Sequence, residues 1–330
     1  MMTVAQVQDR RRDELLHRQV GPLVLTLIGD RDVTDIMVNG DGRVWGDAHG
    51  KGLYDTGITL APSQVESLIG TVAAGVGTVL DAEHPIVEAE VQMAGIRCRF
   101  EGFGPPVVMR PCLAIRKPAQ VLYTIEDYVR DGIVTPAYAE LFRAAIRDRR
   151  NILLAGATGS GKTTLGGALL NAMVALGDPN ERYVTIEDTL ELQCRASNLV
   201  QLRTTAHTDM TQLVRATMRL RPDRIIIGEV RGGEALALLK AWNTGHPGGV
   251  TTIHANDAKA ALTRLSSLVQ EAGVPPQPEL IAETINLIAF IVRTAQGRRV
   301  TELVRVDGYD PRTGFQLTAA EAGEPHATTA

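Results

Sequence analysis

The chain has 330 residues, of which 44% are hydrophobic and 22% charged, and its formal net charge is −4 at pH 7. This length exceeds what one hydrophobic core usually supports, so two domains are expected. The negative net charge excludes a positive potential over the whole surface, which dominates nucleic-acid binding. Cys98, Cys112 and Cys194 are too few and too widely spaced for a zinc module built from C-x-x-C pairs, and their odd number suits a reducing compartment.

The N-terminus does not resemble a signal peptide. Residues 1–12 are polar, lack an apolar core and are expected to be disordered. No apolar run approaches the roughly 18–20 residues of a membrane-spanning helix, and the longest candidate, residues 287–292, has the length of a strand. We therefore expect a cytoplasmic protein.

Residues 13–117 are expected to form a small α+β domain. A helical stripe over residues 13–27 is interrupted by Gly21-Pro22, and residues 62–76 predict a helix that begins near Ser63, with Glu66 completing a capping box. Glycine and proline separate a series of short apolar runs that are typical of strands. The strands are expected at residues 35–39, 43–45, 86–93, 96–100, 107–110 and 113–116.

A linker over residues 118–132, helical from residue 124, leads to a second domain at residues 133–313. Strands and helices alternate there, which predicts an α/β fold with a mostly parallel sheet covered on both faces. Residues 314–330 are rich in Ala, Thr, Glu and Gly and predict a disordered tail. The strands are expected at residues 151–155, 183–186, 199–202, 225–227, 250–254, 288–293 and 300–306, and the helices at residues 164–176, 209–220, 234–243, 257–269 and 279–287.

The most specific motif is a phosphate-binding loop, which matches G-x-x-x-x-G-K-[ST] at every position. Its glycines allow backbone N–H groups to surround phosphate oxygens, and the positive end of the following helix faces the same anion. Lys162 is predicted to reach the β- and γ-phosphates and Thr163 to bind Mg²⁺, so ATP and Mg²⁺ are the expected cofactors. The loop consists of Gly156, Ala157, Thr158, Gly159, Ser160, Gly161, Lys162, Thr163 and Thr164.

An ATPase also needs a residue that orients water. Residues 225–227 look like the apolar strand of a Walker B motif, but Gly228 stands where an aspartate usually lies. Glu229 is therefore the predicted water-orienting base. Mg²⁺ would rely on Thr163, phosphate oxygens, water and an acidic cluster that follows the strand at residues 183–186. That cluster consists of Glu187, Asp188 and Glu191.

A histidine ends the strand at residues 250–254, at the sheet edge where α/β proteins bind ligands. His254 is therefore a candidate sensor of the γ-phosphate, and a structural histidine at this position is an equally good interpretation of the spacing alone. His246 is a weaker candidate.

These blocks together resemble the secretion ATPases of type II and type IV systems, and most closely the TrbB-type ATPases of conjugative transfer. Glycine before the Walker B glutamate is usual in this family, so the resemblance implies that Gly228 does not mark a lost activity. The likeness spans residues 13–306 and is carried by TIEDTLEL at residues 185–192, MRLRPDRIIIGEVRGGEA at 218–235, TGHPGGVTTIHAN at 244–256, TDIMVN at 34–39 and AIRKP at 114–118.

The resemblance further implies a RecA-like P-loop NTPase domain after the smaller α+β domain, assembled as a homohexameric ring. In this family ATP lies between the two domains, and arginines of the N-terminal domain reach the phosphates. Arg97 and Arg116 look like those arginines. Other candidate arginines for phosphate or interface contacts are Arg99, Arg110, Arg203 and Arg231.

Type II members of the family commonly carry a four-cysteine zinc module, which the cysteine spacing excludes here, so the type IV branch is favoured. The resemblance then implies an ATPase at the cytoplasmic face of the inner membrane. It would power conjugative pilus assembly or substrate transfer through a type IV secretion system. Its expected partners are further copies of itself and inner-membrane secretion components, with peripheral membrane association and no direct contact with nucleic acid.

Three alternatives stay open. An ATPase for tight-adherence or type IV pili would carry the same motifs. A RecA-like nucleic-acid motor would share the fold, but the acidic balance and the lack of an aromatic and basic groove signature disfavour it. A nucleotide-gated scaffold that barely hydrolyses ATP is disfavoured because Lys162, Thr163 and Glu229 are all present.

Overall fold

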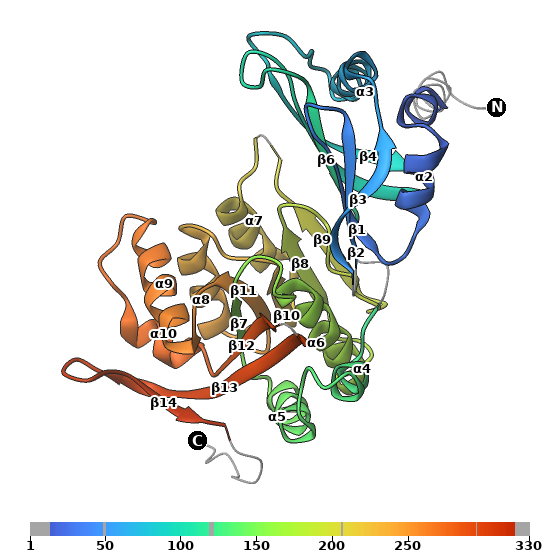
Figure 1. Ribbon diagram of the computed structural model, residues 1–330. Helices are drawn as coiled ribbons and strands as arrows, with labels where there is room; N and C mark the ends of the chain where they lie inside the picture. Colours follow the sequence, from blue (N-terminus) through green and yellow to red (C-terminus); the bar gives the residue numbers. More distant parts are fainter. Residues whose placement is uncertain (1–13, 49–50, 119–121, 206, 295, 321–330) are drawn as a thin grey trace. The chain divides into compact units, whose positions relative to one another are not determined.

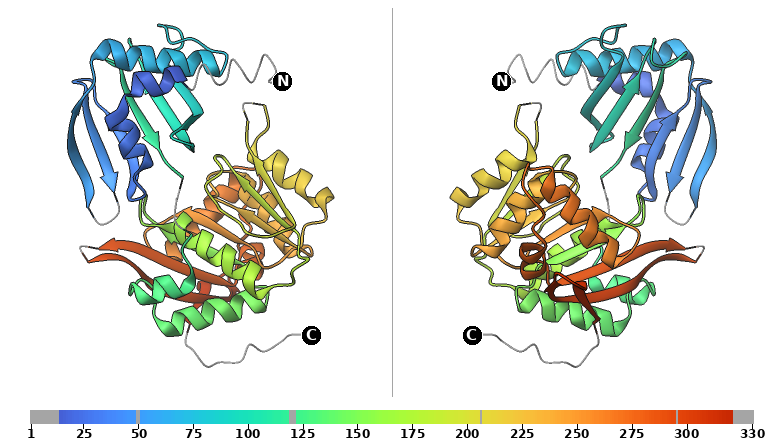
Figure 2. Two further views of the ribbon diagram at one scale, coloured as in Figure 1. Left: turned by 90° about the vertical axis from the view of Figure 1, so that its right-hand side faces the viewer. Right: turned by 90° about the vertical axis from the view of Figure 1, so that its left-hand side faces the viewer.

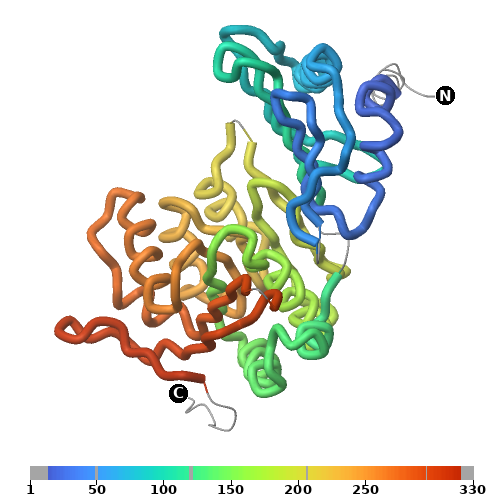
Figure 3. The backbone as a smooth tube through the Cα atoms, viewed as in Figure 1, coloured from blue at the N-terminus to red at the C-terminus, as the bar shows by residue number. Residues whose placement is uncertain are grey.

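The structure is a computed structural model that describes residues 14–48, 51–118, 122–205, 207–294 and 296–320. The chain divides into two compact units, Met1–Val121 and Leu122–Ala330, whose backbones can be followed in Figure 3. The expectations for residues 1–12 and for the last part of the tail lie outside the described residues. Within the described ranges, no helix is both long enough and apolar enough to cross a membrane.

The first unit is built on a six-stranded sheet in which each neighbouring pair of strands is antiparallel (Figure 1). A helical segment at residues 14–20, α2 (Pro22–Gly29) and α3 (Pro62–Gly75) contribute apolar side chains such as Leu16, Ile28 and Leu68 to the core with the sheet. In spatial order the strands are β3 (Gly52–Thr59), β2 (Arg43–Ala48), β1 (Val33–Val38), β6 (Cys112–Arg116), β5 (Ile96–Phe103) and β4 (Ile86–Met93).

Three details of this unit differ from the expectations. Residues 107–110 form a turn and bends instead of a strand, since the two prolines before them offer no N–H group to a ladder. The additional strand β3 has no fully buried side chain, so it lacks the apolar pattern on which prediction depends. The predicted capping box at Ser63 is wrong, because Pro62 takes the first helical position and Ala61 becomes the N-cap.

The second unit contains two sheets rather than one mostly parallel sheet. The smaller, with the order β10 (Arg224–Ile227), β8 (Tyr183–Glu187) and β9 (Leu199–Arg203), is parallel throughout. In the larger, β11 and β12 flank β7 in parallel, whereas β12 with β13 and β13 with β14 pair antiparallel. Its order is β11 (Val250–His254), β7 (Ile152–Gly156), β12 (Leu287–Thr294), β13 (Gly297–Asp310) and β14 (Gly314–Ala319).

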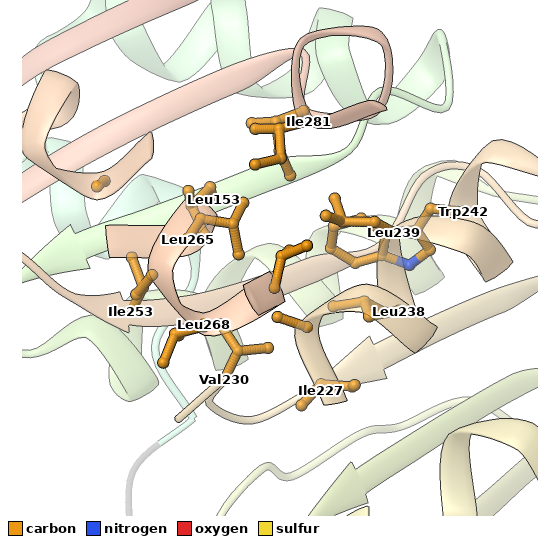
Figure 4. Packing of buried hydrophobic residues seen from close by; sticks show 14 of the residues in the cluster. Leu153, Ile227, Val230, Leu238, Leu239, Trp242, Ile253, Leu265, Leu268 and Ile281 are labelled. Carbon is orange, nitrogen blue, oxygen red and sulfur yellow. The ribbon is translucent and has the colours of Figure 1, made fainter. Parts of the chain in front are cut away.

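Helices cover both faces of these strands (Figure 2). One core contains Leu153 and Ile227 and is shown in Figure 4, whereas the neighbouring residues Leu154 and Ile226 point into the other core. This alternation is that of strands buried on both sides, and strands of both sheets contribute to each core. The first core is covered by α7 (Met210–Thr217), α8 (Glu234–Asn243), α9 (Ala258–Gln270) and α10 (Pro278–Thr284), and the second by α4 (Ile125–Arg130), α5 (Pro136–Arg147) and α6 (Lys162–Leu176).

The expected disordered tail begins with a strand. Residues 314–319 form β14, which pairs with β13 in the hairpin at the end of the described chain (Figure 1). Phe315 and Leu317 pack against the first core, and the Phe315 ring meets Tyr309 edge to face with 5.1 Å between the ring centroids. This packing orders a segment whose composition alone suggested disorder.

A buried polar network holds the amino-terminal ends of the strands together. Arg224, 2% exposed, donates from Nε to Glu181 Oε2 at 2.9 Å and from Nη1 to the carbonyl oxygen of Gly248 at 2.9 Å. Asn151 accepts a hydrogen bond from the N–H of Gly248 at 2.7 Å and donates to the carbonyl oxygen of Thr284 at 2.8 Å. These side chains link the two sheets at one edge, and the carboxyl ends of the parallel strands meet at the opposite edge.

Candidate functional site

The phosphate-binding loop connects β7 to α6 at that opposite edge. β7 is buried at every residue, and the chain leaves it at Gly156 and enters α6 at Lys162. Gly159 has a φ of 72° and Gly161 a φ of 101°, left-handed values that residues with a Cβ rarely adopt. Because Gly161 is also the N-cap of α6, the first free N–H groups of the helix open into the loop. The loop can therefore present several N–H groups to one anion.

The hairpin of β12 and β13 packs against both ends of the loop. A Cβ at Gly156 would collide with the carbonyl oxygen of Ile291, and a Cβ at Gly161 would come within 2.8 Å of Arg298 Cδ. Larger residues would push the loop off the hairpin, so the glycines are required for packing as well as for conformation. Ser160 is 2% exposed, and its Oγ has no hydrogen-bond partner in the described part of the chain. That hydroxyl is therefore free to bind an anion.

Lys162 lies inside the loop. Only 6% of its surface is exposed, and Nζ donates to the carbonyl oxygens of Gly156 at 3.0 Å and Ala157 at 2.9 Å. Burial lowers the pKa of Lys162, and the nearby carboxylate of Glu229 opposes that shift. An anion that entered the loop would offer this buried ammonium group a stronger, charged partner than the two carbonyls.

Glu229 and His254 meet beside Lys162. His254 ends β11 and is in parallel register with Gly156 of β7, and Glu229 follows the end of β10. His254 Nε2 lies 2.7 Å from Glu229 Oε1, and Nδ1 of the same ring lies 3.3 Å from Lys162 Nζ. Burial, followed by the positive charge of Lys162, lowers the pKa of His254 below its usual 6.5. The imidazole is therefore mostly neutral at pH 7.

Arg231 connects Glu229 to the end of β8. Its Nη2 donates to Glu229 Oε2 at 2.7 Å, and its Nη1 lies 3.4 Å from Asp188 Oδ2. Asp188 accepts a further hydrogen bond from Thr204 Oγ1 at 3.0 Å. The two carboxylate oxygens of Glu229 thus face different partners, His254 on one side and Arg231 on the other.

The side chain of Glu187 explains the glycine at position 228. Glu187 is 3% exposed, and its Oε1 accepts the N–H groups of Glu191 at 3.1 Å and Leu192 at 3.0 Å. A Cβ at Gly228 would lie 3.0 Å from Glu187 Cγ, so the glutamate occupies the space into which an aspartate at position 228 would project. Glu187 Oε2 is buried without a hydrogen-bond partner among the residues described, and burial raises the pKa of this carboxyl to about 7.

The acidic cluster expected to hold Mg²⁺ does not converge on one point. The described stretches contain no group of three His, Cys, Asp or Glu side chains arranged for a metal ion. Asp188 is engaged by Arg231, and the backbone of Glu191 caps Glu187. Thr163 lies in the first turn of α6, and Oε2 of Glu187 is buried without a hydrogen-bond partner in the described part of the chain. Binding of a divalent ion by these residues stays a prediction.

The N-terminal arginines belong to the first unit. Arg97 on β5 lies 3.9 Å from Glu90 on β4, measured from Nη1 to Oε2. Arg116 at the end of β6 donates from Nε to Asp35 Oδ1 at 2.7 Å. Both arginine side chains are more than half exposed, and their contact with phosphates stays a prediction.

Sequence reasoning missed two features of the site. Arg298 lies across Gly161, a contact that depends on how the last strands fold back and that leaves no signal in the loop motif. Arg231 was expected to contact phosphates or an interface, but it binds Glu229. The sequence signal for this bond is that Arg231 follows Glu229 by two residues in the same strand-to-helix loop. His246 lies elsewhere, with Nδ1 2.7 Å from the carbonyl oxygen of Pro222, which favours a structural role.

Comparisons with known proteins place this arrangement among secretion proteins. Residues 86–321 match the family described as "Type II/IV secretion system protein". A probable conjugal transfer protein TrbB of Sinorhizobium fredii is 46% identical over 294 residues, 89% of each chain. The type IV secretion system protein PtlH of Bordetella pertussis is 32% identical over 322 residues, 84% of this chain and 91% of that protein. The crystallised ATPase DotB of Yersinia pseudotuberculosis has a similar fold, with a TM-score of 0.60 and 20% identity, covering 92% of this chain and 80% of that one.

Proposed function

Because the chain belongs to the type II/IV secretion system protein family, we propose that it is an ATPase that powers conjugative pilus assembly or substrate transfer through a type IV secretion system. The observation that best supports hydrolysis is the convergence of Lys162, Glu229 and His254 at the carboxyl ends of neighbouring strands. A phosphate in the loop would meet a cation, a carboxylate and a neutral imidazole there. Phosphoryl transfer to water uses such groups to bind charge, orient water and detect the terminal phosphate.

In the proposed mechanism Lys162 exchanges the carbonyl oxygens of Gly156 and Ala157 for phosphate oxygens. The exchange is favourable because phosphate oxygens carry negative charge, whereas the two carbonyl oxygens are neutral acceptors. Thr163, Glu187 and Asp188 are the residues that would hold Mg²⁺. A bound Mg²⁺ supplies positive charge that offsets the negative charge developing on the phosphate.

Glu229 is proposed to orient the attacking water and to accept its proton. His254 lies between this carboxylate and the Lys162 ammonium group, with one ring nitrogen toward each. A γ-phosphate that draws Lys162 away would therefore also change the contacts of the imidazole, and through them the position of Glu229. This coupling gives His254 its proposed role as γ-phosphate sensor.

The finer features of the proposal come from the family. We propose a RecA-like catalytic domain within a homohexameric ring, with Arg97 and Arg116 as the arginines that reach the phosphates of ATP. The ring would dock on inner-membrane secretion components at the cytoplasmic face, touch the membrane peripherally and make no direct contact with nucleic acid. Helices on both faces of the parallel strands support the RecA-like part of this proposal.

The proposal is tested by measuring steady-state phosphate release together with the mass of the particle in the presence of Mg²⁺ and ATP. We expect turnover by a species six times the mass of the chain. In cells, deletion of the gene is expected to abolish conjugative transfer, which the wild-type gene restores and Lys162→Ala does not. Loss of pilus-dependent adhesion with normal transfer would instead favour the pilus ATPase alternative.

A further inference from the structure

The loop from β10 to α8, residues 228–233, is fixed by contacts on several sides. Glu234 Oε1 accepts the N–H of Arg231 at 2.6 Å, so the first turn of α8 holds the backbone of the loop. The N–H of Val230 donates to a carbonyl oxygen of β11 at 3.0 Å. A Cβ at Gly233 would lie 3.1 Å from the backbone nitrogen of Ala272, so the loop also packs tightly against the end of α9. The Cα of Arg231 is therefore held in one place.

From this position the guanidinium group of Arg231 bridges two strands. One terminal nitrogen meets Glu229, which follows β10, and the other meets Asp188, which follows β8. These strands are parallel neighbours, so the two acids lie side by side beyond the sheet edge. A planar guanidinium group has donors fixed in a fork that can serve two carboxylates at once, which a lysine ammonium group cannot do in the same geometry.

The contact with Arg231 distinguishes the two carboxylate oxygens of Glu229. With Oε2 engaged by Arg231, Oε1 is the oxygen directed toward His254 and the phosphate loop. The terminal torsion of a glutamate is otherwise broad, and small misplacements of a catalytic group lower the rate strongly. We propose that Arg231 is a positioning residue that holds Glu229 in its reactive orientation and ties it to Asp188. The inference rests on the proposed ATP hydrolysis.

The competing role for Arg231 is direct binding of phosphate, since its side chain is 56% exposed. The two roles differ in kinetics. Removing a side chain that binds phosphate in the ground state weakens ATP binding, whereas a misplaced base lowers kcat and leaves binding unchanged. The substitution Arg231→Gln should therefore separate them.

The experiment measures kcat and KM for ATP in wild-type protein and in the variants Arg231→Gln, Arg231→Lys and Arg147→Gln. Arg147→Gln is the matched control, because Arg147 is an exposed arginine in the last turn of α5. We expect Arg231→Gln to lower kcat about tenfold or more with KM within about twofold of wild type. Arg231→Lys should recover part of the loss, and Arg147→Gln should behave as wild type.

A double-mutant cycle with Glu229→Gln completes the test. If Arg231 acts through Glu229, adding Arg231→Gln to Glu229→Gln should cause no further loss. Three outcomes would overturn the inference and leave the proposed function standing. They are an unchanged kcat in Arg231→Gln, a raised KM with a normal kcat in that variant, and additive losses in the cycle. A lack of turnover by wild-type protein would overturn the proposed function, and this inference with it.

Discussion

His254 Nε2 lies 2.7 Å from Glu229 Oε1, and the other nitrogen of the same ring lies 3.3 Å from Lys162 Nζ. One imidazole thus connects the side chain of the phosphate loop with the proposed base. The connection follows from the parallel pairing of β7 with β11, which puts His254 opposite Gly156. We therefore expect a change in the contacts of Lys162 to alter the position of Glu229.

The first prediction concerns His254 and pH. The pKa of His254 is lowered in the folded protein, so the folded protein protonates this imidazole at a lower pH than the unfolded chain does. The stability that comes from the neutral ring is therefore fully present above pH 6.5 and is lost as the pH falls. The variant His254→Gln should lack this component. Thermal unfolding between pH 5 and 8 should show a smaller loss of stability at acid pH in the variant, and an identical pH dependence would contradict the prediction.

The second prediction concerns Glu187, whose pKa burial raises to about 7. The folded protein binds this proton more tightly than the unfolded chain does, so stability should decrease as the pH rises from about 4.5 to 7 and then level off. Glu187→Gln removes this cost, which is on the order of 3 kcal/mol. We expect the variant to be more stable than wild type at pH 8 and similar at pH 4.5, as measured by urea unfolding with EDTA. Equal stability at pH 8 would show that burial does not raise the pKa of this carboxyl.

The third prediction tests the space beside Gly228. A Cβ there would lie 3.0 Å from Glu187 Cγ, so Gly228→Ala should cost about 1–3 kcal/mol of stability and displace the adjoining Glu229. Gly228→Asp should be worse, because it sets a second carboxylate against Glu187. Gly167→Ala is the control: Gly167 lies within α6 with nothing in reach of its Cβ, and alanine there should stabilise by about 0.5–1 kcal/mol. Full stability and turnover in Gly228→Asp would contradict this account.

The fourth prediction concerns the buried pair of Arg224 and Glu181, which are 2% and 8% exposed. Glu181→Leu leaves the Arg224 charge buried without its acid, and we expect a loss of about 3–5 kcal/mol in urea unfolding. The double variant with Arg224→Met should recover much of that loss. Failure of the second substitution to recover stability would show that the hydrogen bonds from Arg224 to the carbonyl oxygens of Gly248 and Ile146 matter more than the ion pair.

The sequence predicted those elements whose residues form a recognisable local pattern. The loop at Gly156 to Thr164 needs glycine, lysine and threonine at fixed spacing, and the strand that ends at His254 has a β-branched residue at every position from 250 to 253. Both could therefore be placed without tertiary information. α5 was overlooked although it carries a signal, since Thr135 caps it, Pro136 opens it and Phe142 lies on its buried side.

Other features depend on contacts that no single segment encodes. β3 is a strand because β2 pairs with it, and β14 because Phe315 and Leu317 find a core to cover. The acidic residues after β8 looked equivalent in sequence. Only the fold shows that Glu187 packs on Gly228 and that Asp188 turns to Arg231.

The central claim is tested most directly by phosphate release from wild-type protein and from Glu229→Gln, with ATP binding measured in parallel. Glu279→Gln, at an exposed glutamate of α10, is the control. We expect turnover by wild type and by the control, and we expect Glu229→Gln to bind ATP but to hydrolyse it about a hundredfold or more slowly. Hydrolysis by Glu229→Gln at the wild-type rate would contradict the central claim.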